Sequence, residues 1–130
     1  MEIEKKLDQL GIKLPGVGKP VGNYVPSVRV GNLLFVSGHI GDLTDALGQL
    51  DVDVSIQEGY QAARKTAIRL LGTVKAELGD LDKVKRIVKL LCMVNSAVGF
   101  SNQPAVANGC SDLLVEVFGD KGRHARSAVG

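Results

Sequence analysis

The sequence predicts a single α+β domain, in which one mixed β-sheet carries two long helices on one of its faces. Segments with the apolar period of a strand alternate along the chain with segments that have the period of a helix, which is typical of such layers. The 130 residues are enough to bury one core. The chain is 45% hydrophobic and 23% charged, as in ordinary globular proteins. We therefore expect one domain over residues 1–130.

The first part of the chain is predicted to lead into this domain. Residues 2–10 are expected to form a short helix, because apolar side chains recur at i, i+4 and i+7 and Gly11 follows as a stop signal. Residues 11–23 are expected to form a loop, because glycine and proline are too frequent there for regular structure. This stretch does not connect a strand to a helix, so a phosphate cradle is not expected.

A β-hairpin is predicted over residues 27–40. Gly31 and Asn32 give a tight-turn signal between its two arms. The second arm is apolar on both faces, which indicates that it is covered on both sides. Residues 41–54 are predicted to form a loop with a short strand near its end.

The long helix is predicted over residues 56–78. Ser55 and Glu58 have the spacing of a capping box, and an apolar stripe with helical period follows them. Gly79 is expected to end the helix.

The remaining elements are a strand, a helix and a strand. Residues 83–97 are expected to form the strand, because apolar and basic residues alternate before a fully apolar stretch. Residues 103–118 are expected to form the second long helix, residues 119–122 a turn, and residues 123–129 the last strand. With both helices on one face, the apolar strand residues on the other face need a cover. A further copy of the chain is the simplest cover, so oligomers are expected, of a size that this pattern does not fix.

Composition excludes several classes of function. The net charge of +2 and the absence of tryptophan argue against nucleic-acid binding. The two cysteines, Cys92 and Cys110, lie apart from any histidine cluster, so no zinc site is expected and both are interpreted as reduced, buried thiols. Because neither a signal peptide nor an apolar run of membrane-spanning length is found, a cytoplasmic protein without membrane partners is expected.

A few polar residues are candidates for chemistry. Arg126 lies among small residues in the last strand, where a guanidinium could bind a carboxylate through two points, or could be a solvated edge arginine. His39 and His124 lie at strand ends, and each could be a general base or a structural imidazole. Ser37 and Gly38 follow a buried strand, where a hydroxyl and a close backbone approach could serve a ligand.

Several segments resemble known sequences. Residues 23–26 (NYVP) and 31–40 (GNLLFVSGHI) resemble the N-terminal signature of the RidA/YjgF family of imine/enamine deaminases. Asn108 lies in a stretch similar to the family's pocket helix, and residues 125–127 (ARS) are similar to its C-terminal element. The stretches LDQLGIKLP and DLLVEVFG look closer to a divergent branch of somewhat longer members.

The resemblance implies a chorismate-mutase-like fold, a homotrimer whose sheets line a central barrel, and pockets between subunits. It implies hydrolysis of 2-imino or enamine acids to 2-keto acids and ammonia, without metal or cofactor, on a small substrate that bears a carboxylate. Arg126 would be the catalytic residue that binds this carboxylate. The substrate-binding residues would be Tyr24, Ser37, Gly38, Asn108, Arg126 and Ala128, the last through its carbonyl group.

The sequence departs from the family pattern at two points. Ala128 stands where cysteine is frequent. The family also continues into a final strand with a glutamate that holds the water, whereas this sequence ends at Gly130, so it is either shortened or without that strand. A non-catalytic trimeric module that binds keto acids or proteins is therefore the alternative hypothesis, and a ribonuclease is less expected.

Overall fold

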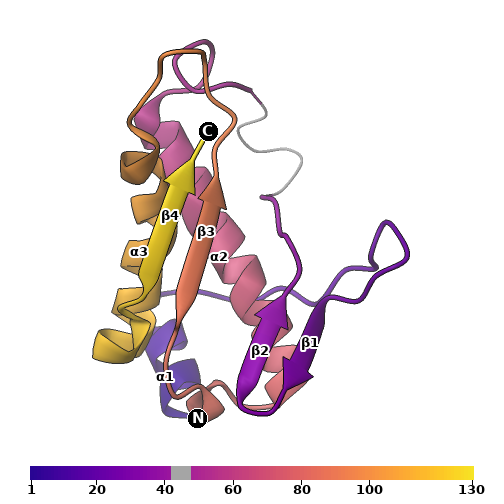
Figure 1. Cartoon of the computed structure of the whole chain (residues 1–130). Helices are drawn as coiled ribbons and strands as arrows, with labels where there is room; N and C mark the ends of the chain where they lie inside the picture. The colour runs from indigo at the N-terminus through magenta and orange to yellow at the C-terminus, as the bar shows by residue number, and fades with distance from the viewer. Residues whose placement is uncertain (42–47) are drawn as a thin grey trace.

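The computed structural model describes residues 1–41 and 48–130, and it contains three α-helices and four short strands (Figure 1). In chain order they are α1 (Glu2–Gln9), β1 (Ser27–Val30), β2 (Leu33–Val36), α2 (Ile56–Leu78), η1 (Leu81–Lys83), β3 (Lys89–Met93), α3 (Gln103–Phe118), η2 (Gly119–Gly122) and β4 (Ala125–Val129).

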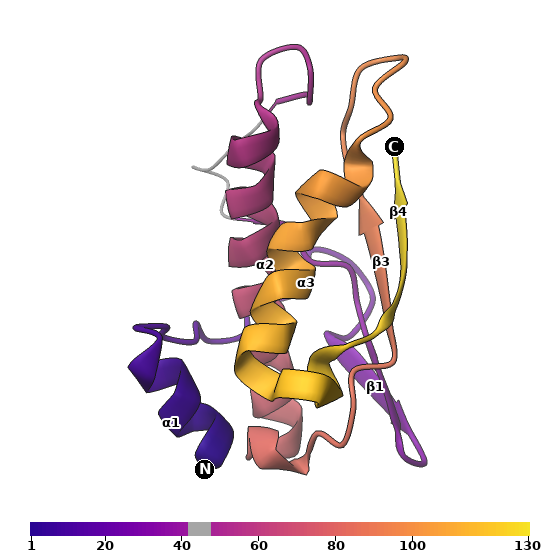
Figure 2. The same cartoon turned by 90° about the vertical axis from the view of Figure 1, so that its left-hand side faces the viewer.

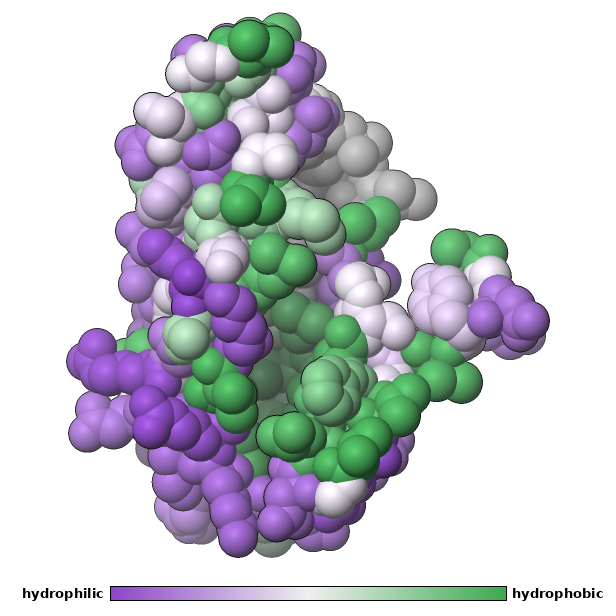
Figure 3. Space-filling model, viewed as in Figure 1, coloured by the Kyte–Doolittle hydropathy of each residue, from purple (hydrophilic) through white to green (hydrophobic). Residues whose placement is uncertain are grey.

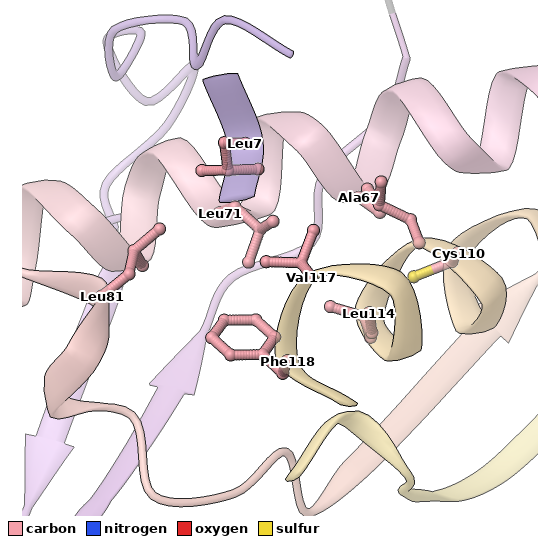
Figure 4. Packing of buried hydrophobic residues seen from close by; sticks show 9 residues of the cluster. Leu7, Ala67, Leu71, Leu81, Cys110, Leu114, Val117 and Phe118 are labelled. Atoms are coloured by element: carbon pink, nitrogen blue, oxygen red, sulfur yellow. The ribbon is translucent and has the colours of Figure 1, made fainter. Parts of the chain in front are cut away.

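The helices lie where the sequence predicts them. The bounds of α2 and α3 are those expected, and the capping box at the start of α2 is present, with the Ser55 hydroxyl accepting from the Glu58 N–H. The helices pack together around a common apolar cluster (Figure 4). Its buried members are Leu7, Ala67, Leu71, Leu81, Cys110, Leu113, Leu114, Val117 and Phe118.

Helix α1 is attached by its first turn to the η1 turn. The Asp82 carboxylate accepts hydrogen bonds from the backbone N–H groups of Glu2 and Ile3, both at 2.9 Å, and also binds the N-terminal ammonium. This carboxylate therefore caps α1 from another part of the chain, at the end where the helix dipole favours negative charge. The pKa of Asp82 is lowered to about 2 by the N-terminal ammonium and then by the two backbone donors.

The prediction of one mixed sheet is wrong for the described residues, whose named strands form two ladders. β1 and β2 pair antiparallel around the Gly31 turn, with Ser27 opposite Val36, and β3 and β4 pair parallel, with Lys89 opposite Ala125. The hairpin packs on α2, whereas β4 packs on α3, so the two ladders lie over different helices. The edges of β2 and β3 consequently remain apart (Figure 1).

The long strand predicted over residues 83–97 is also wrong in extent, because only Lys89–Met93 is a strand. In the preceding segment Val84 and Ile87 pack on the core, and Leu90 inside β3 continues this spacing of three, while Val88 is 60% exposed. β4 begins only at Ala125 because the preceding η2 turn ends at Gly122, so the ladder cannot start earlier. Backbone contact with the end of the chain begins just before the ladder, where the Ile87 N–H donates to the Lys121 carbonyl and the Ala125 N–H donates to the Val88 carbonyl. The regular pairing with β4, and not the apolar alternation, therefore sets the strand's start.

A hairpin is predicted over residues 27–40, but its ladder ends at Val36. The next residue, Ser37, still donates its N–H to the Pro26 carbonyl at 2.9 Å. In the predicted loop over residues 41–54, residues 42–47 lie outside the described part of the chain. Leu50 makes only isolated bridges, to Val54 and Ser96, in place of the expected short strand.

The helices lie on one face of the strands, as predicted (Figure 2). On the opposite face, hydrophobic side chains gather over the strands, around a depression between the two ladders (Figure 3). Those of Val30, Phe35, Leu91 and Met93 are 58% to 73% exposed. Such a patch is unusual for a protein that acts as a monomer.

None of the helices that the structure describes is both long and apolar enough to cross a membrane.

Candidate functional site

Arg126, the second residue of β4, reaches toward helix α3. Its Nη1 donates to the Asn108 side-chain oxygen at 2.7 Å and to the Ser111 hydroxyl oxygen at 3.2 Å. To the residues that the structure describes, Nε and Nη2 of Arg126 donate no hydrogen bond. One corner of the guanidinium is therefore held by the protein, and the Nε–Nη2 edge stays available for a two-point contact.

The Ser111 hydroxyl connects Arg126 to an imidazole. Ser111 Oγ lies 2.9 Å from His124 Nε2, and His124 Nδ1 lies 2.6 Å from the Gly122 carbonyl oxygen. Because a carbonyl oxygen only accepts, Nδ1 donates to it, and in the tautomer that carries its proton on Nδ1 the Nε2 atom accepts from the serine hydroxyl. The hydrogen bonds run in one direction, from Arg126 through Ser111 and His124 to Gly122.

Helix α3 and β4 bring these residues together through their regular spacing. Asn108 and Ser111 are three residues apart on α3 and so share a face, and His124 and Arg126 are two residues apart at the start of β4. A Cβ added to Gly109 would overlap the Tyr60 carbonyl oxygen, so only glycine permits the close approach of α2 to α3. A Cβ added to Gly122 would overlap the Leu114 carbonyl oxygen, so a glycine there sets the position of the His124 partner.

Ser111, His124 and Arg126 line an open hollow of about 290 Å³. Its lining residues are Ser111, Asp112, Val115, Arg123, His124 and Arg126.

The acidic groups near this hollow are already engaged. The Asp112 carboxylate accepts from the Tyr60 hydroxyl at 2.7 Å, and this hydrogen bond raises the pKa of Tyr60. Arg123 pairs with Asp120 at 3.3 Å, where both side chains are largely exposed. Since an exposed ion pair is weak, the hollow offers positive charge to an anion.

Only some of the predicted site residues lie together. Asn108 and Arg126 are in contact, and Ala128 follows two residues later in β4. Tyr24, Ser37 and Gly38 belong to the hairpin region, and no hydrogen bond joins them to Arg126 among the described residues. Within one chain the predicted site is therefore divided between two places.

The hairpin side has its own hydrogen bonds. The Ser37 hydroxyl donates to the Val25 carbonyl at 2.6 Å, so its proton is already used within the chain. The Tyr24 side chain is 49% exposed. His39 contacts the Ser37 carbonyl and the hydroxyl of Thr73, a residue that is 3% exposed.

Both thiols are free, and burial raises their pKa values. Cys110 is buried, with a pKa raised to about 12, and Cys92 is half-buried with a raised pKa. Such thiols are poor nucleophiles at neutral pH. In the part of the chain that the structure describes, no group of three or more histidine, cysteine or acidic residues could hold a metal ion.

Sequence reasoning left Ser111 and Arg123 out of the site, and it left His124 open between a general base and a structural imidazole without connecting it to Arg126. The sequence feature that could have pointed to Ser111 and His124 is their spacing from predicted site residues. Ser111 lies one helical turn after Asn108, and His124 lies two residues before Arg126. The packing of α3 against β4, which no local pattern reveals, was needed to connect the two pairs.

Comparison with known proteins identifies relatives of nearly the whole chain. Residues 4–129 match the family described as YjgF/chorismate mutase-like, putative endoribonuclease. Protein TCP17 of Trypanosoma cruzi is 47% identical over 98% of this chain and 82% of its own length.

Two solved structures have the same fold. A putative endoribonuclease from Shewanella oneidensis MR-1 aligns with a TM-score of 0.92 and 35% identity, over 98% of this chain and 86% of that one. The protein Atu1372 of unknown function from Agrobacterium tumefaciens aligns with a TM-score of 0.86 and 42% identity, over 98% of this chain and 80% of that one. Together with the architecture above, these matches show that the chain belongs to the YjgF/chorismate mutase-like family.

Proposed function

We propose that the protein hydrolyses 2-imino or enamine acids to 2-keto acids and ammonia, with Arg126 binding the substrate carboxylate. The observation that carries this proposal is the hydrogen bonding of Arg126. Asn108 and Ser111 both accept from Nη1, which leaves the Nε–Nη2 edge for a carboxylate. A planar guanidinium with two parallel N–H donors matches the geometry of a carboxylate.

We further propose that the complete pocket forms between copies of the chain in a homotrimer whose sheets line a central barrel. Tyr24, Ser37 and Gly38 lie apart from Arg126 in one chain, so a second copy would have to bring its hairpin region to the first. The exposed apolar face over the strands supports this assembly, because burying it would stabilise an oligomer. Binding of Ala128 through its carbonyl belongs to the same proposal.

The test is an assay in which a threonine dehydratase releases the imine and keto-acid formation is followed over time. We expect the protein to accelerate this step, and Arg126→Ala to lower kcat/KM by at least about 100-fold. Each hydrogen bond to a charged group contributes about 1.5–3 kcal/mol, and two are lost. Arg126→Lys should recover little, because a lysine ammonium lacks the planar fork.

Arg29→Ala is the matched control, since Arg29 is an exposed arginine in the hairpin whose Nε donates to the nearby Gly31 carbonyl. This variant should keep full activity. An Arg126→Ala protein as active as the wild type would contradict the proposal.

The alternative is a module that binds keto acids without turnover, with the same Arg126 contact. It predicts that 2-ketobutyrate raises the Tm of the wild type and not of Arg126→Ala, while the imine hydrolyses at its uncatalysed rate. Ribonuclease activity ranks lower, although relatives carry that name. Cleavage of RNA by general acid and general base needs two such groups, and of His124 and Asp112, which line the described hollow, Asp112 already accepts from the Tyr60 hydroxyl.

A further inference from the structure

Residues 37–41, which follow β2, are attached to helix α2. His39 Nε2 lies 2.8 Å from the Thr73 hydroxyl oxygen. Arg69, one helical turn before Thr73, donates from Nη1 to the Ile40 carbonyl at 2.9 Å. The segment is therefore held against the helix at two points, although it lies beyond the ladder of the hairpin.

Thr73 is the only buried polar side chain among the residues that the structure describes, with 3% of its surface exposed. A buried hydroxyl costs free energy unless it is hydrogen-bonded, whereas a valine of nearly the same shape carries no such cost. His39 supplies the hydrogen-bond partner from the hairpin side. The hydroxyl therefore gives the imidazole a specific attachment, which an apolar side chain at this position could not give.

The other side of the imidazole holds a peptide group. His39 Nδ1 lies 2.7 Å from the Ser37 carbonyl oxygen, and because this oxygen only accepts, Nδ1 donates to it. The N–H and the hydroxyl of Ser37 are used as well, by the carbonyls of Pro26 and Val25. In a planar trans peptide the N–H points opposite to the carbonyl, so a fixed Ser37 carbonyl also fixes the direction of the Gly38 N–H.

Gly38 itself lies in open space. It is exposed, and a Cβ built on it would meet no atom within 4 Å. To the residues that the structure describes, its N–H donates no hydrogen bond. The hairpin therefore presents a backbone donor that is available to a ligand and whose direction depends on the His39 ring.

We propose that His39, anchored on Thr73, is the positioning residue that sets the direction of the Ser37–Gly38 peptide on the hairpin side of the substrate pocket. The proposal rests on the function proposed above, in which Ser37 and Gly38 line a pocket shared between copies of the chain. A glycine without such a neighbour has wide freedom in φ and ψ, so its N–H has no fixed direction. A donor that is oriented before the ligand arrives improves affinity, because less ordering is needed on binding.

The test is Thr73→Val in the coupled imine assay, with the imine level set by the amount of dehydratase. Valine keeps the shape of the side chain and removes the hydroxyl that holds the ring. We expect KM to rise about tenfold, the effect of losing one hydrogen bond, while kcat stays within about threefold. His39→Ala removes the ring itself and should raise KM at least as much.

Two variants separate positioning from stability. Thr73→Ser keeps the hydroxyl and loses a buried methyl group, so it should lower the Tm and keep KM within about twofold. Thr66→Val removes a hydroxyl that donates to the Ala62 carbonyl of the same helix at 2.9 Å, and it should leave KM unchanged. If Thr73 served stability alone, KM would not depend on which Thr73 variant keeps the hydroxyl.

A second readout does not need turnover. In the ligand-free protein we expect Thr73→Val, and not Thr66→Val, to shift the NMR resonances of the Ser37 carbonyl carbon and the Gly38 amide nitrogen. If the wild type is active and both Thr73→Val and His39→Ala keep KM within about twofold, the inference is wrong. If the wild type shows no turnover, the proposed function fails, and the resonances still decide: a shift supports the orientation of this peptide by His39, and unchanged resonances overturn it.

Discussion

The direction of the hydrogen bonds around Arg126 is the most informative feature at the scale of single residues. Asn108 accepts from the same nitrogen as Ser111, so both contacts orient the guanidinium without using its outer edge. An amide oxygen suits this role because it is a neutral acceptor, whereas a carboxylate would also neutralise the charge that a substrate needs.

Removing this acceptor should weaken substrate binding. In Asn108→Ala, Arg126 loses its shortest orienting hydrogen bond, and we expect KM to rise about tenfold, which corresponds to about 1.4 kcal/mol, with a smaller change in kcat. Steady-state kinetics at several imine levels measures this split.

Asn102→Ala is the control on the same helix. Asn102 precedes α3 as its N-cap residue and makes no side-chain capping hydrogen bond there. An unchanged KM in Asn108→Ala would show that the guanidinium is held without the amide.

Resemblance to a family pointed to Arg126 and Asn108 in the sequence, but spacing alone left Arg126 open between a ligand clamp and an edge arginine. Ser111 was missed because a serine inside a helix has no signal of its own. Its role depends on which strand packs against that face of α3, and that is decided by the whole core.

At the scale of elements, the helices were easier to predict than the strands. The capping box and the apolar stripe of α2 are local, so its bounds follow from nearby residues. The limits of β3 depend on where β4 begins, 36 residues later in the pairing of Lys89 with Ala125. A strand is defined by its partner, and residues 84–86, which precede the first backbone hydrogen bonds to the end of the chain, show how apolar alternation can mislead.

The attachment of α1 gives a prediction about pH. The pKa of Asp82 falls from 3.8 to about 2 on folding, through the N-terminal ammonium and then the backbone N–H groups of Ile3 and Glu2. A lowered pKa means that this stabilisation is fully present above the unfolded value and is lost as the pH falls through the folded one. We expect the free energy of unfolding to fall between about pH 4 and pH 2 partly for this reason.

Urea denaturation at several pH values checks this expectation. In Asp82→Asn the decline over that window should be shallower, and the far-ultraviolet helix signal should be slightly lower at neutral pH. Glu77→Gln is a suitable control, because Glu77 is an exposed acid in the last turn of α2. If the free energy of unfolding falls equally steeply with pH in the wild type and in Asp82→Asn, the Asp82 carboxylate does not contribute to this pH dependence.

At the scale of the whole molecule, the arrangement leaves an apolar face that one chain does not cover. The helices occupy one side, and the strands expose large side chains on the other (Figures 2 and 3). The sequence predicted this face from the apolar strand residues. The separation of the two ladders was not predicted, since it depends on which helix each ladder packs against.

A charge placed on this face should prevent assembly without unfolding the chain. Phe35 is 61% exposed and Leu91 is 58% exposed, so Phe35→Lys and Leu91→Lys disturb no core contact. For the wild type we expect sedimentation equilibrium to give three times the 13.7 kDa chain mass. For both variants we expect a lower mass and lost deaminase activity, because the composite pocket would be divided.

Val21→Lys controls for the added charge, since Val21 is 96% exposed in the N-terminal loop. It should leave both mass and activity unchanged. A wild type that sediments as a single chain would contradict the trimer, and full activity in that state would contradict the shared pocket.

The parallel pairing of β3 and β4 links the site to the order of folding. Parallel strands cannot be joined by a tight turn, so this ladder needs the intervening chain, with α3, as its crossover connection. Contacts between residues far apart in sequence form slowly, because the loop must close before they are gained. We therefore expect the meeting of Arg126 with Asn108 and Ser111, which needs β4 seated on α3, to be a late event in folding. A chain with its helices formed but its ladder open would have no anion site, so an anion that binds there recognises only the fully folded chain.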